Sequence, residues 1–255
     1  MGRCRSKIYS MTPKFDNLTR QYLNEKDESR RKWLKRGIGG AAALAAGVGG
    51  YSLLSPETCD ASQLDPKLRA ILTPKISQNN NPQFWENMFN HVCWAEGKGK
   101  RGKPGYAYKD SRGKLTIGIG YNITGHGNDA MYDLQETLRI DGNPHSATYN
   151  DLISSRKPLT EHQMVWLYRH EVSIAYNNAI KFLPDLSKHP DNVQLIIIDM
   201  SYNMGIGTLK KFVLFQKALV NHDYVTAAKE MKNSRWYTQT GRRARKLHDL
   251  MQNIR

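Results

Sequence analysis

The sequence predicts an α+β fold in which a small β-sheet lobe precedes a larger, mainly helical lobe. Three observations support this prediction. Aromatic and apolar residues recur at helical spacing from about residue 82, and strand-forming residues follow between about 106 and 122. From about residue 160 to the end, helical patterns succeed one another with short breaks. We therefore expect one folded domain over residues 82–255, preceded by an N-terminal tether.

The composition divides this tether into three segments. Residues 1–36 are polar and basic, residues 37–56 are uncharged and rich in Gly and Ala, and residues 57–81 carry the Pro and Asn residues typical of a linker. The middle segment is long enough to span a bilayer core of about 30 Å as a helix, and the basic residues before it would keep the N-terminus in the cytoplasm. Membrane insertion, a flexible connection and a small-residue packing helix all remain open for 37–56.

The charge of the chain is strongly basic. Lys and Arg number 38 against 23 Asp and Glu, a formal net charge of +15, and the excess is concentrated in residues 1–36, 97–114 and 226–255. A basic surface attracts polyanions such as nucleic acid, anionic lipid or the acidic polymers of a bacterial envelope, and it is equally compatible with an ordinary solvated face. Because no nucleic-acid-binding motif is recognisable, we expect no nucleic-acid partner.

The cysteines and histidines predict no metal site and no other cofactor. Cys4, Cys59 and Cys93 lack metal-ligand spacing, and the eight His residues are scattered. An odd number of cysteines argues against a disulfide scaffold. A bridge between Cys59 and Cys93 would suit an oxidising compartment, and the sequence leaves its formation open.

Capping residues predict where several elements begin. Asn81 and Pro82 open a helix that ends at Glu96, Thr160 begins a capping box, and Asp191 caps a buried helix. The turn at 110–113 separates two strands, and no helix is expected from 122 to 158. The remaining predicted helices cover about 160–183, 191–204, 208–221, 223–232 and 241–253.

Glu96 and Asp110 suggest a chemistry. Cleavage of a glycosidic bond needs a carboxylic acid to protonate the leaving oxygen and a second carboxylate as base or nucleophile. Glu96 ends a helix of large apolar residues, surroundings that raise the pKa of a carboxyl group, whereas Asp110 lies on a polar turn and should stay ionised. Thr116, on the next strand, could hydrogen-bond a water molecule held by Asp110. Spacing alone would leave both carboxylates as ordinary surface residues.

A resemblance strengthens this interpretation. Four segments in the same order, covering roughly 82–255, resemble the phage-type lysozymes, the glycoside hydrolase family 24 enzymes typified by the lysozymes of T-even bacteriophages. These segments are Glu96-Gly97, Tyr108-Lys109-Asp110 with Gly113 and Thr116-Ile117-Gly118-Ile119-Gly120, Asp199 to Gly205, and Ser234 to Thr240 with Arg242-Arg243-Ala244. The resemblance implies a two-lobed lysozyme fold.

The same resemblance implies an inverting hydrolysis of peptidoglycan. In it Glu96 protonates the glycosidic oxygen, while Asp110 and Thr116 position the attacking water. Residues expected to line the glycan cleft are Gln239, Asn203 and Arg235, and each could equally have a structural role. Two departures stand out: Tyr121 replaces the family's usual His, and the connection over 122–158 is longer than in the T-even enzymes.

Other functions remain open. A lytic transglycosylase would need one acid and no water-positioning carboxylate. A virion structural or membrane-penetrating protein could use a lysozyme-like domain only to bind glycan. If the chain is an enzyme, it is either an endolysin tethered through 37–56 or a virion-associated lysozyme, acting on the cell wall in the periplasm. Expected partners are peptidoglycan, and in these settings the inner membrane, anionic envelope polymers or other virion proteins.

Overall fold

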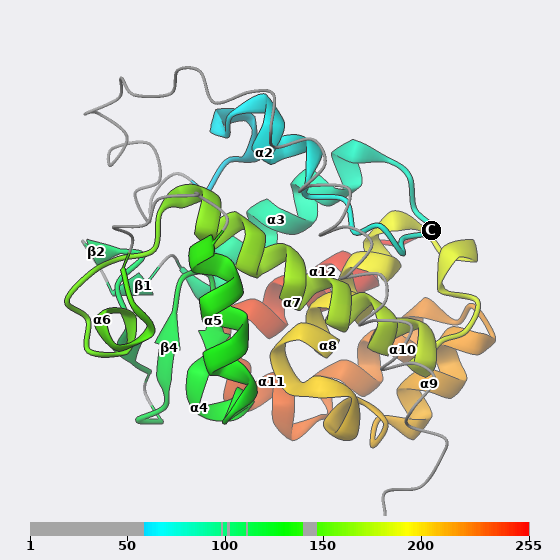
Figure 1. The fold of residues 1–255 in the computed structure, drawn as a ribbon. Helices are drawn as coiled ribbons and strands as arrows, with labels where there is room; N and C mark the ends of the chain where they lie inside the picture. Colours follow the sequence, from blue (N-terminus) through cyan, green and yellow to red (C-terminus); the bar gives the residue numbers. More distant parts are fainter. Residues whose placement is uncertain (1–58, 98, 101–102, 111, 140–146, 255) are drawn as a thin grey trace, which may run out of the picture. The chain divides into compact units, whose positions relative to one another are not determined.

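The first helix of the predicted domain appears with the predicted bounds. In the computed structural model, which describes residues 59–97, 99–100, 103–110, 112–139 and 147–254, α3 spans Pro82–Glu96 (Figure 1). Pro82 occupies its first turn, and the Asn81 side chain accepts a hydrogen bond from the backbone N–H of Gln83. Its apolar face is buried, with Trp85 and Phe89 fully inaccessible. These contacts anchor Glu96 at the C-terminal end of a rigid helix.

The predictions for residues 1–36 and 37–56 lie outside the described residues, as do residues 57 and 58. Among the helices that the structure does describe, none combines the length and the apolar character needed to cross a bilayer.

Residues 59–81, which we predicted to be part of a linker, instead pack against the domain. They form the short helices η1 (Ala61–Gln63) and α2 (Pro66–Ala70), and Leu64, Leu68 and Leu72 are buried. These three leucines, spaced four residues apart, supply the apolar surface that a solvated linker would lack.

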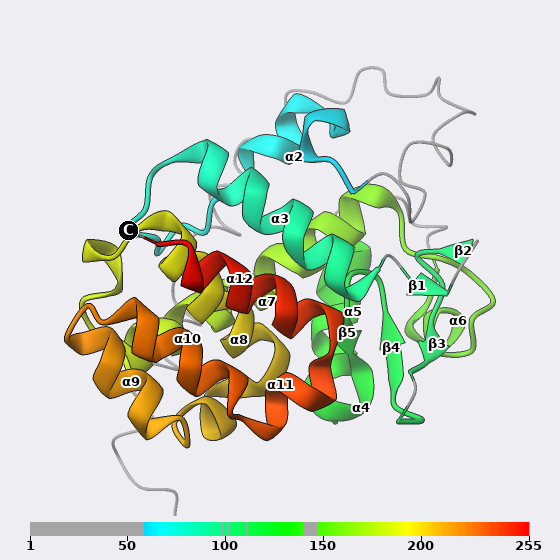
Figure 2. The same ribbon diagram turned by 180° about the vertical axis from the view of Figure 1, so that it is seen from behind.

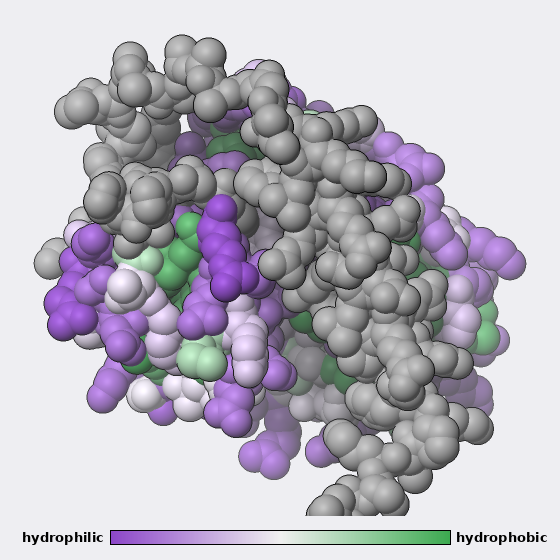
Figure 3. Space-filling view, in the orientation of Figure 1, coloured by the Kyte–Doolittle hydropathy of each residue, from purple (hydrophilic) through white to green (hydrophobic). Residues whose placement is uncertain are grey.

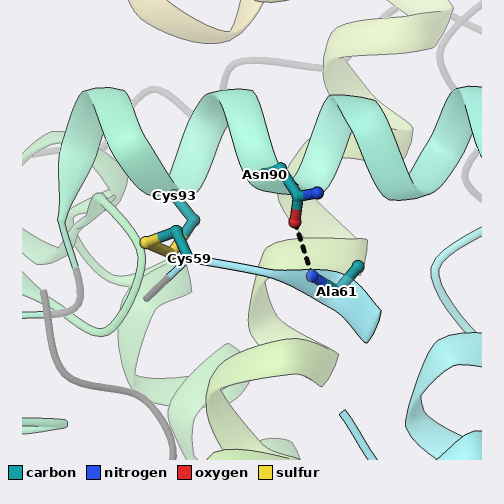
Figure 4. Close-up of a disulfide and its surroundings, with 4 residues drawn as sticks. All are labelled: Cys59, Ala61, Asn90 and Cys93. Carbon is teal, nitrogen blue, oxygen red and sulfur yellow. Dashed lines mark hydrogen bonds between the residues drawn. A yellow bond between two sulfur atoms is a disulfide. The ribbon is translucent and has the colours of Figure 1, made fainter. Parts of the chain in front are cut away.

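A disulfide bond and a hydrogen bond attach this segment to α3. Cys59 is bonded to Cys93, with the two Cα atoms 5.7 Å apart, and the Asn90 side chain accepts a hydrogen bond of 2.6 Å from the backbone N–H of Ala61 (Figure 4). The bridge that the sequence left open is therefore present in the structure.

The sheet lobe contains two small antiparallel sheets. A hairpin in the basic loop pairs β1 (Gly99–Lys100) with β2 (Lys103–Pro104). The second sheet has the order β3-β4-β5, and its strands are Tyr108–Lys109, Leu115–Ile117 and Tyr121–Asn122. The predicted turn after Asp110 connects β3 and β4 and confirms the hairpin.

The connection after β5 was predicted to contain no helix, and this prediction is wrong. It forms α4 (Ile123–His126), α5 (Asp129–Arg139) and α6 (Tyr149–Ile153). Along α5, Ala130, Leu134 and Leu138 are buried at a spacing of four residues. Asn122 and Gly127, which suggested a loop, are the N-cap and C-cap residues of α4.

Two long helices form the centre of the helical lobe. α7 (Glu161–Phe182) opens with the predicted capping box, in which Thr160 and Gln163 each bond the other's backbone N–H. α8 is the buried helix that the apolar run predicted, and it spans Asp191–Leu209. Pro190, not Asp191, occupies its N-cap position, and helical hydrogen bonding resumes beyond Gly205, a non-helical residue with φ of 72°.

Four shorter helices complete the lobe: α9 (Val213–Val220), α10 (Tyr224–Lys232), α11 (Arg235–Thr240) and α12 (Arg242–Gln252). Only α11 was not anticipated. Figures 1 and 2 show the strands on one side of α3 and α7, with α8 to α12 on the other. In Figure 3 the strand side, at the left, is mainly hydrophilic. Within the described residues, this arrangement is the predicted α+β fold with a small sheet lobe and a larger helical lobe.

Candidate active site

A cleft of about 1400 Å³ runs between the sheet and the helical lobe. Its walls come from the end of α3, the β3–β4 turn, α7, α8, α11 and the start of α12. The structure brings all six predicted site residues to this cleft: Glu96, Asp110, Thr116, Asn203, Arg235 and Gln239. Residues more than a hundred positions apart in the sequence therefore share one solvent-accessible concavity.

Glu96 is held by an arginine from the other end of the chain. Nη1 of Arg243, in the first turn of α12, donates a short hydrogen bond to Oε1 of Glu96. The immediate partner of Glu96 is thus a cation, whereas the sequence suggested apolar surroundings. On another side, a Cβ atom added to Gly120 would lie 2.8 Å from Cγ of Glu96. A residue with a side chain at position 120 would displace the carboxylate.

Arg243 is itself fixed by a buried carboxylate. Its Nε and Nη2 donate to the two oxygens of Asp199 at 2.8 and 2.7 Å, and Nε2 of His91 lies 3.3 Å from the same carboxylate. Burial opposes ionisation of the fully buried Asp199, but the charge of Arg243 and hydrogen bonds from His91 and Arg243 hold its pKa well below the usual range. This ion-pair network connects α3, α8 and α12 behind Glu96.

The pKa of Arg243 is shifted in the opposite direction to that of Asp199. Burial favours loss of the guanidinium proton, but the neighbouring carboxylates of Asp199 and Glu96 outweigh burial and raise the pKa of Arg243. The guanidinium is therefore a permanent cation shared between two carboxyl groups. The two parallel hydrogen bonds to Asp199 fix the plane of the guanidinium group and the direction of its remaining N–H groups.

Asp110 is held by its own turn. Its Oδ1 accepts hydrogen bonds of 2.8 Å from the backbone N–H groups of Arg112 and Lys114, and its backbone pairs with Lys114 and Gly113. A short polar side chain that accepts from amides two and four residues ahead is a local device for closing a turn. The sequence Asp110 to Gly113 carries all the information for this arrangement.

Thr116 and Tyr108 lie on neighbouring strands and line the same cleft as the two carboxylates. Thr116 is 6% exposed and pairs with Tyr108 across β3 and β4, and its hydroxyl lies 3.4 Å from the carbonyl of Lys114. Burial raises the pKa of Tyr108, with further contributions from the charges of Glu96 and Asp110. Both carboxylates thus act on the same phenol.

The three predicted glycan-cleft residues come from α8 and α11. Asn203 accepts a hydrogen bond of 2.9 Å from the indole N–H of Trp236, which orients its amide in the cleft wall. Arg235 and Gln239 lie four residues apart, about one turn of α11, and both line the cleft. Trp236 also lines the cleft, but it is only 7% exposed, so most of its side chain packs against the protein.

Tyr121, which stands where the resembling family has His, is buried beneath the cleft. Its hydroxyl donates to Asp133 at 2.7 Å, and its ring stacks on His126 with centroids 4.5 Å apart. Nε2 of His126 lies 3.1 Å from Glu171, and this hydrogen bond raises the pKa of His126. Tyr121 therefore joins β5 to α4, α5 and, through His126, α7.

Sequence reasoning assigned no role to Arg243 or Asp199. Both fall inside segments that carried the resemblance, but nothing local in the sequence links residues on α8 and α12. The available signal was a charged residue inside the apolar run of α8, because a buried carboxylate requires a cationic partner. Among the described residues, the one group of His, Cys, Asp or Glu side chains close enough to share a metal ion lies outside the cleft.

Two proteins of Dictyostelium discoideum are similar to this chain. One, named probable T4-type lysozyme 1, is 33% identical over 147 residues, which cover 55% of this chain and 81% of that protein. The other, named probable T4-type lysozyme 2, is 29% identical over 146 residues with the same coverage. A search of protein families found no family model that matches the sequence.

Proposed function

Since the chain belongs to the T4-type lysozyme family, we propose that it is a peptidoglycan hydrolase that cleaves the β-1,4 bond between N-acetylmuramic acid and N-acetylglucosamine. The observation that carries this proposal is the shared cleft of Glu96, Asp110 and Thr116. A glycosidase needs two carboxylates on opposite sides of the scissile bond. Here the two come from different lobes.

In the proposed mechanism, Glu96 protonates the glycosidic oxygen. Arg243 binds Oε1, so we assign the transferred proton to Oε2. Asp199 balances the Arg243 cation with two hydrogen bonds, so that Arg243 can orient the acid without bringing an uncompensated positive charge to it.

Asp110 and Thr116 would position the attacking water on the opposite face of the sugar. Both turn hydrogen bonds fall on Oδ1 of Asp110, and we assign Oδ2 to the water as general base. The Thr116 hydroxyl, on the neighbouring strand, would hold the same water. An attack by water rather than by the carboxylate inverts the anomeric centre.

The glycan would lie along α8 and α11. The amide groups of Asn203 and Gln239 offer donors and acceptors for sugar hydroxyl and acetamido groups, and Arg235 adds a cation for the acidic polymer. The biological setting extends the proposal: an endolysin or virion-associated lysozyme that acts in the periplasm, with residues 1–56 as its tether. The basic cluster ahead of the Gly/Ala segment supports this setting.

The test is digestion of purified peptidoglycan by the full chain, with products identified by mass spectrometry. Glu96→Gln should reduce turnover by about 10²- to 10⁴-fold, the usual contribution of a general acid. The matched control is Glu86→Gln, a carboxylate on the same helix paired with Arg69 outside the cleft, which should retain activity.

Each product pattern has a defined meaning. Reducing-end muropeptides from the wild type and the control, but not from Glu96→Gln, support hydrolysis through Glu96. Anhydro products would make the enzyme a transglycosylase. Full activity of a correctly folded Glu96→Gln variant, checked by circular dichroism, would overturn the assignment of the acid.

A further inference from the structure

Three potential metal ligands converge on the helical lobe away from the cleft. Asp185 and His189 flank the short helix η2 (Leu186–Lys188), which connects α7 to α8, and His222 lies in the turn between α9 and α10. One ligand atom from each residue lies within 4.8 Å of the other two. None of these three described residues lines the cleft.

The most informative atom of the cluster is Nε2 of His189. The residue is 3% exposed, and Nε2 has no hydrogen-bond partner among the residues that the structure describes. Oδ1 of Asp185 lies 3.7 Å away, which is too long for a hydrogen bond. Buried polar atoms are normally satisfied, so this nitrogen is available to a ligand that enters between His189 and Asp185.

Tyr224 orients both imidazoles. Its hydroxyl oxygen lies 3.1 Å from Nδ1 of His189 and 2.9 Å from Nδ1 of His222. A hydroxyl oxygen can accept two hydrogen bonds. When both Nδ1 atoms donate to it, both Nε2 atoms present lone pairs, which is the tautomer that a metal ion requires. A second partner that fixes the tautomer is the usual support of a histidine ligand.

The backbone of the cluster fits the same role. His222 has φ of 54°, a left-handed conformation uncommon for residues other than Gly. This backbone places the His222 ring against that of His189, with centroids 4.5 Å apart.

We propose that Asp185, His189 and His222 form a binding site for a divalent transition-metal ion of the Zn²⁺ type, with water completing its coordination. Two imidazole nitrogens and one carboxylate favour Zn²⁺, Ni²⁺, Co²⁺ or Cu²⁺ over Mg²⁺ and Ca²⁺, which prefer all-oxygen sites. In a tetrahedral zinc site with bonds of about 2.0–2.1 Å, ligand atoms lie about 3.4 Å apart. The ligand atoms, which lie within 4.8 Å of one another in the structure, would therefore move closer together when the ion binds. His222 is the exposed one of the three ligands, so its side chain can make this movement.

Metal binding here would connect two parts of the helical lobe. The ion would tie the α7–α8 connection to the α9–α10 turn, and a ligand that binds only the folded state stabilises it. We predicted no metal site from the sequence because the eight His residues are scattered along it. Asp185 and His189 are four residues apart, but His222 is 33 residues further on. The third ligand enters from a different helix pair.

The test is titration of ZnCl₂ into the metal-stripped full chain at pH 7.5, followed by calorimetry and thermal unfolding. The wild type should bind one Zn²⁺ ion and gain thermal stability. His222→Ala, a substitution at an exposed position, should lose both effects, and Asp185→Asn should weaken binding. Tyr224→Phe should weaken binding by about 10- to 100-fold, as expected for a supporting residue.

The matched control is His162→Ala, which removes an exposed His at the opposite end of α7 and should leave Zn²⁺ binding unchanged. Absence of binding to the wild type would overturn the proposal. Undiminished binding to a folded His222→Ala variant would equally overturn it, because the ion would then be bound elsewhere.

Discussion

Glu96 and Asp110 line the same cleft, but the protein holds them by opposite means. Glu96 depends on Arg243, 147 positions along the chain, which depends in turn on the buried Asp199. Asp110 depends on two backbone N–H groups no more than four residues away. One carboxylate is positioned by the tertiary fold and the other by a turn.

The difference predicts how each side responds to substitution. A turn-held carboxylate can lose its charge while its hydrogen bonds survive, because an amide oxygen accepts the same bonds. A carboxylate held through a buried ion-pair network cannot, because removal of one charge leaves another uncompensated inside the protein. Substitutions on the Asp110 side should therefore affect catalysis alone, whereas those on the Glu96 side should affect catalysis and folding together.

The largest expected effect is on the turn-held side. Asp110→Asn should reduce turnover of peptidoglycan by about 10²- to 10⁴-fold, through loss of the general base. The melting temperature should change little, because Asn can still accept from Arg112 and Lys114. Asp223→Asn is the matched control, since Asp223 accepts from Thr226 N–H at 2.9 Å and does not line the cleft. Retained activity of Asp110→Asn would reduce Asp110 to a structural role.

On the Glu96 side, which the tertiary fold holds in place, a substitution in the ion-pair network should mainly lower the stability of the protein. Asp199→Ala leaves Arg243 without its buried partner and should lower the free energy of unfolding by about 3–5 kcal/mol, measured by urea denaturation at pH 7. As a control, Glu136→Ala removes an exposed pair with Arg139 and should change stability by less than about 1 kcal/mol. An equal effect of the two substitutions would contradict the importance of the network.

The same network has a predictable pH dependence. The folded pKa of Asp199 lies below the unfolded value of about 3.9. Its contribution to stability is therefore complete above pH 3.9 and is lost as the pH falls through the folded pKa. The difference in the free energy of unfolding between the wild type and Asp199→Asn should be constant from pH 5 to 8. It should shrink only in strong acid.

The contact between Gly120 and Glu96 permits a finer test. Gly120→Ala would place a Cβ atom 2.8 Å from Glu96 at a backbone φ of 76°, so it should displace the carboxylate, and a shift of about 1 Å can cost 10²-fold in rate. Gly127→Ala imposes similar backbone strain, at φ of 56°, with nothing within 4 Å of the added atom. Equal activity losses in the two variants would attribute the effect to strain rather than to Glu96.

The two sides of the cleft also explain what the sequence could predict. The turn at Asp110, the capping box at Thr160 and the cap at Asn81 are local, and all three appear as predicted. The partners of Glu96 are not local. Nothing in the residues around 96 specifies Arg243, since that contact exists only after α3, α8 and α12 have packed.

The wrong predictions have a similar physical origin. Residues 59–81 contain Pro and Asn residues typical of a linker, but buried leucines and the bond from Cys59 to Cys93 attach the segment to α3. The connection from 123 to 153 forms short helices whose apolar faces gain stability only by packing. In both places tertiary burial overrides a composition that, in isolation, favours a loop.

The smallest expected effect concerns Glu171, a third cleft carboxylate that lies between the two extremes. It is held by one side chain, His126, whose folded pKa is raised by this hydrogen bond. The stability that the pair contributes is complete below the unfolded His pKa of about 6.5 and is lost as the pH rises through the higher folded value. Because both side chains are partly exposed, the contribution should be below about 1 kcal/mol.

Thermal unfolding of the wild type and of Glu171→Gln between pH 5 and 9 measures this contribution. It appears as a difference in melting temperature between the two proteins that changes with pH. The wild type should lose its advantage over Glu171→Gln as the pH rises, because neutral His126 gains little from a carboxylate. Glu86→Gln, which removes a partner of Arg69, should differ from the wild type by the same amount at every pH in this range, because guanidinium groups stay charged throughout it. If the difference in melting temperature between the wild type and Glu171→Gln is also independent of pH, the charge of His126 does not stabilise Glu171. Glu171 would then resemble Asp110, which has no charged partner of this kind.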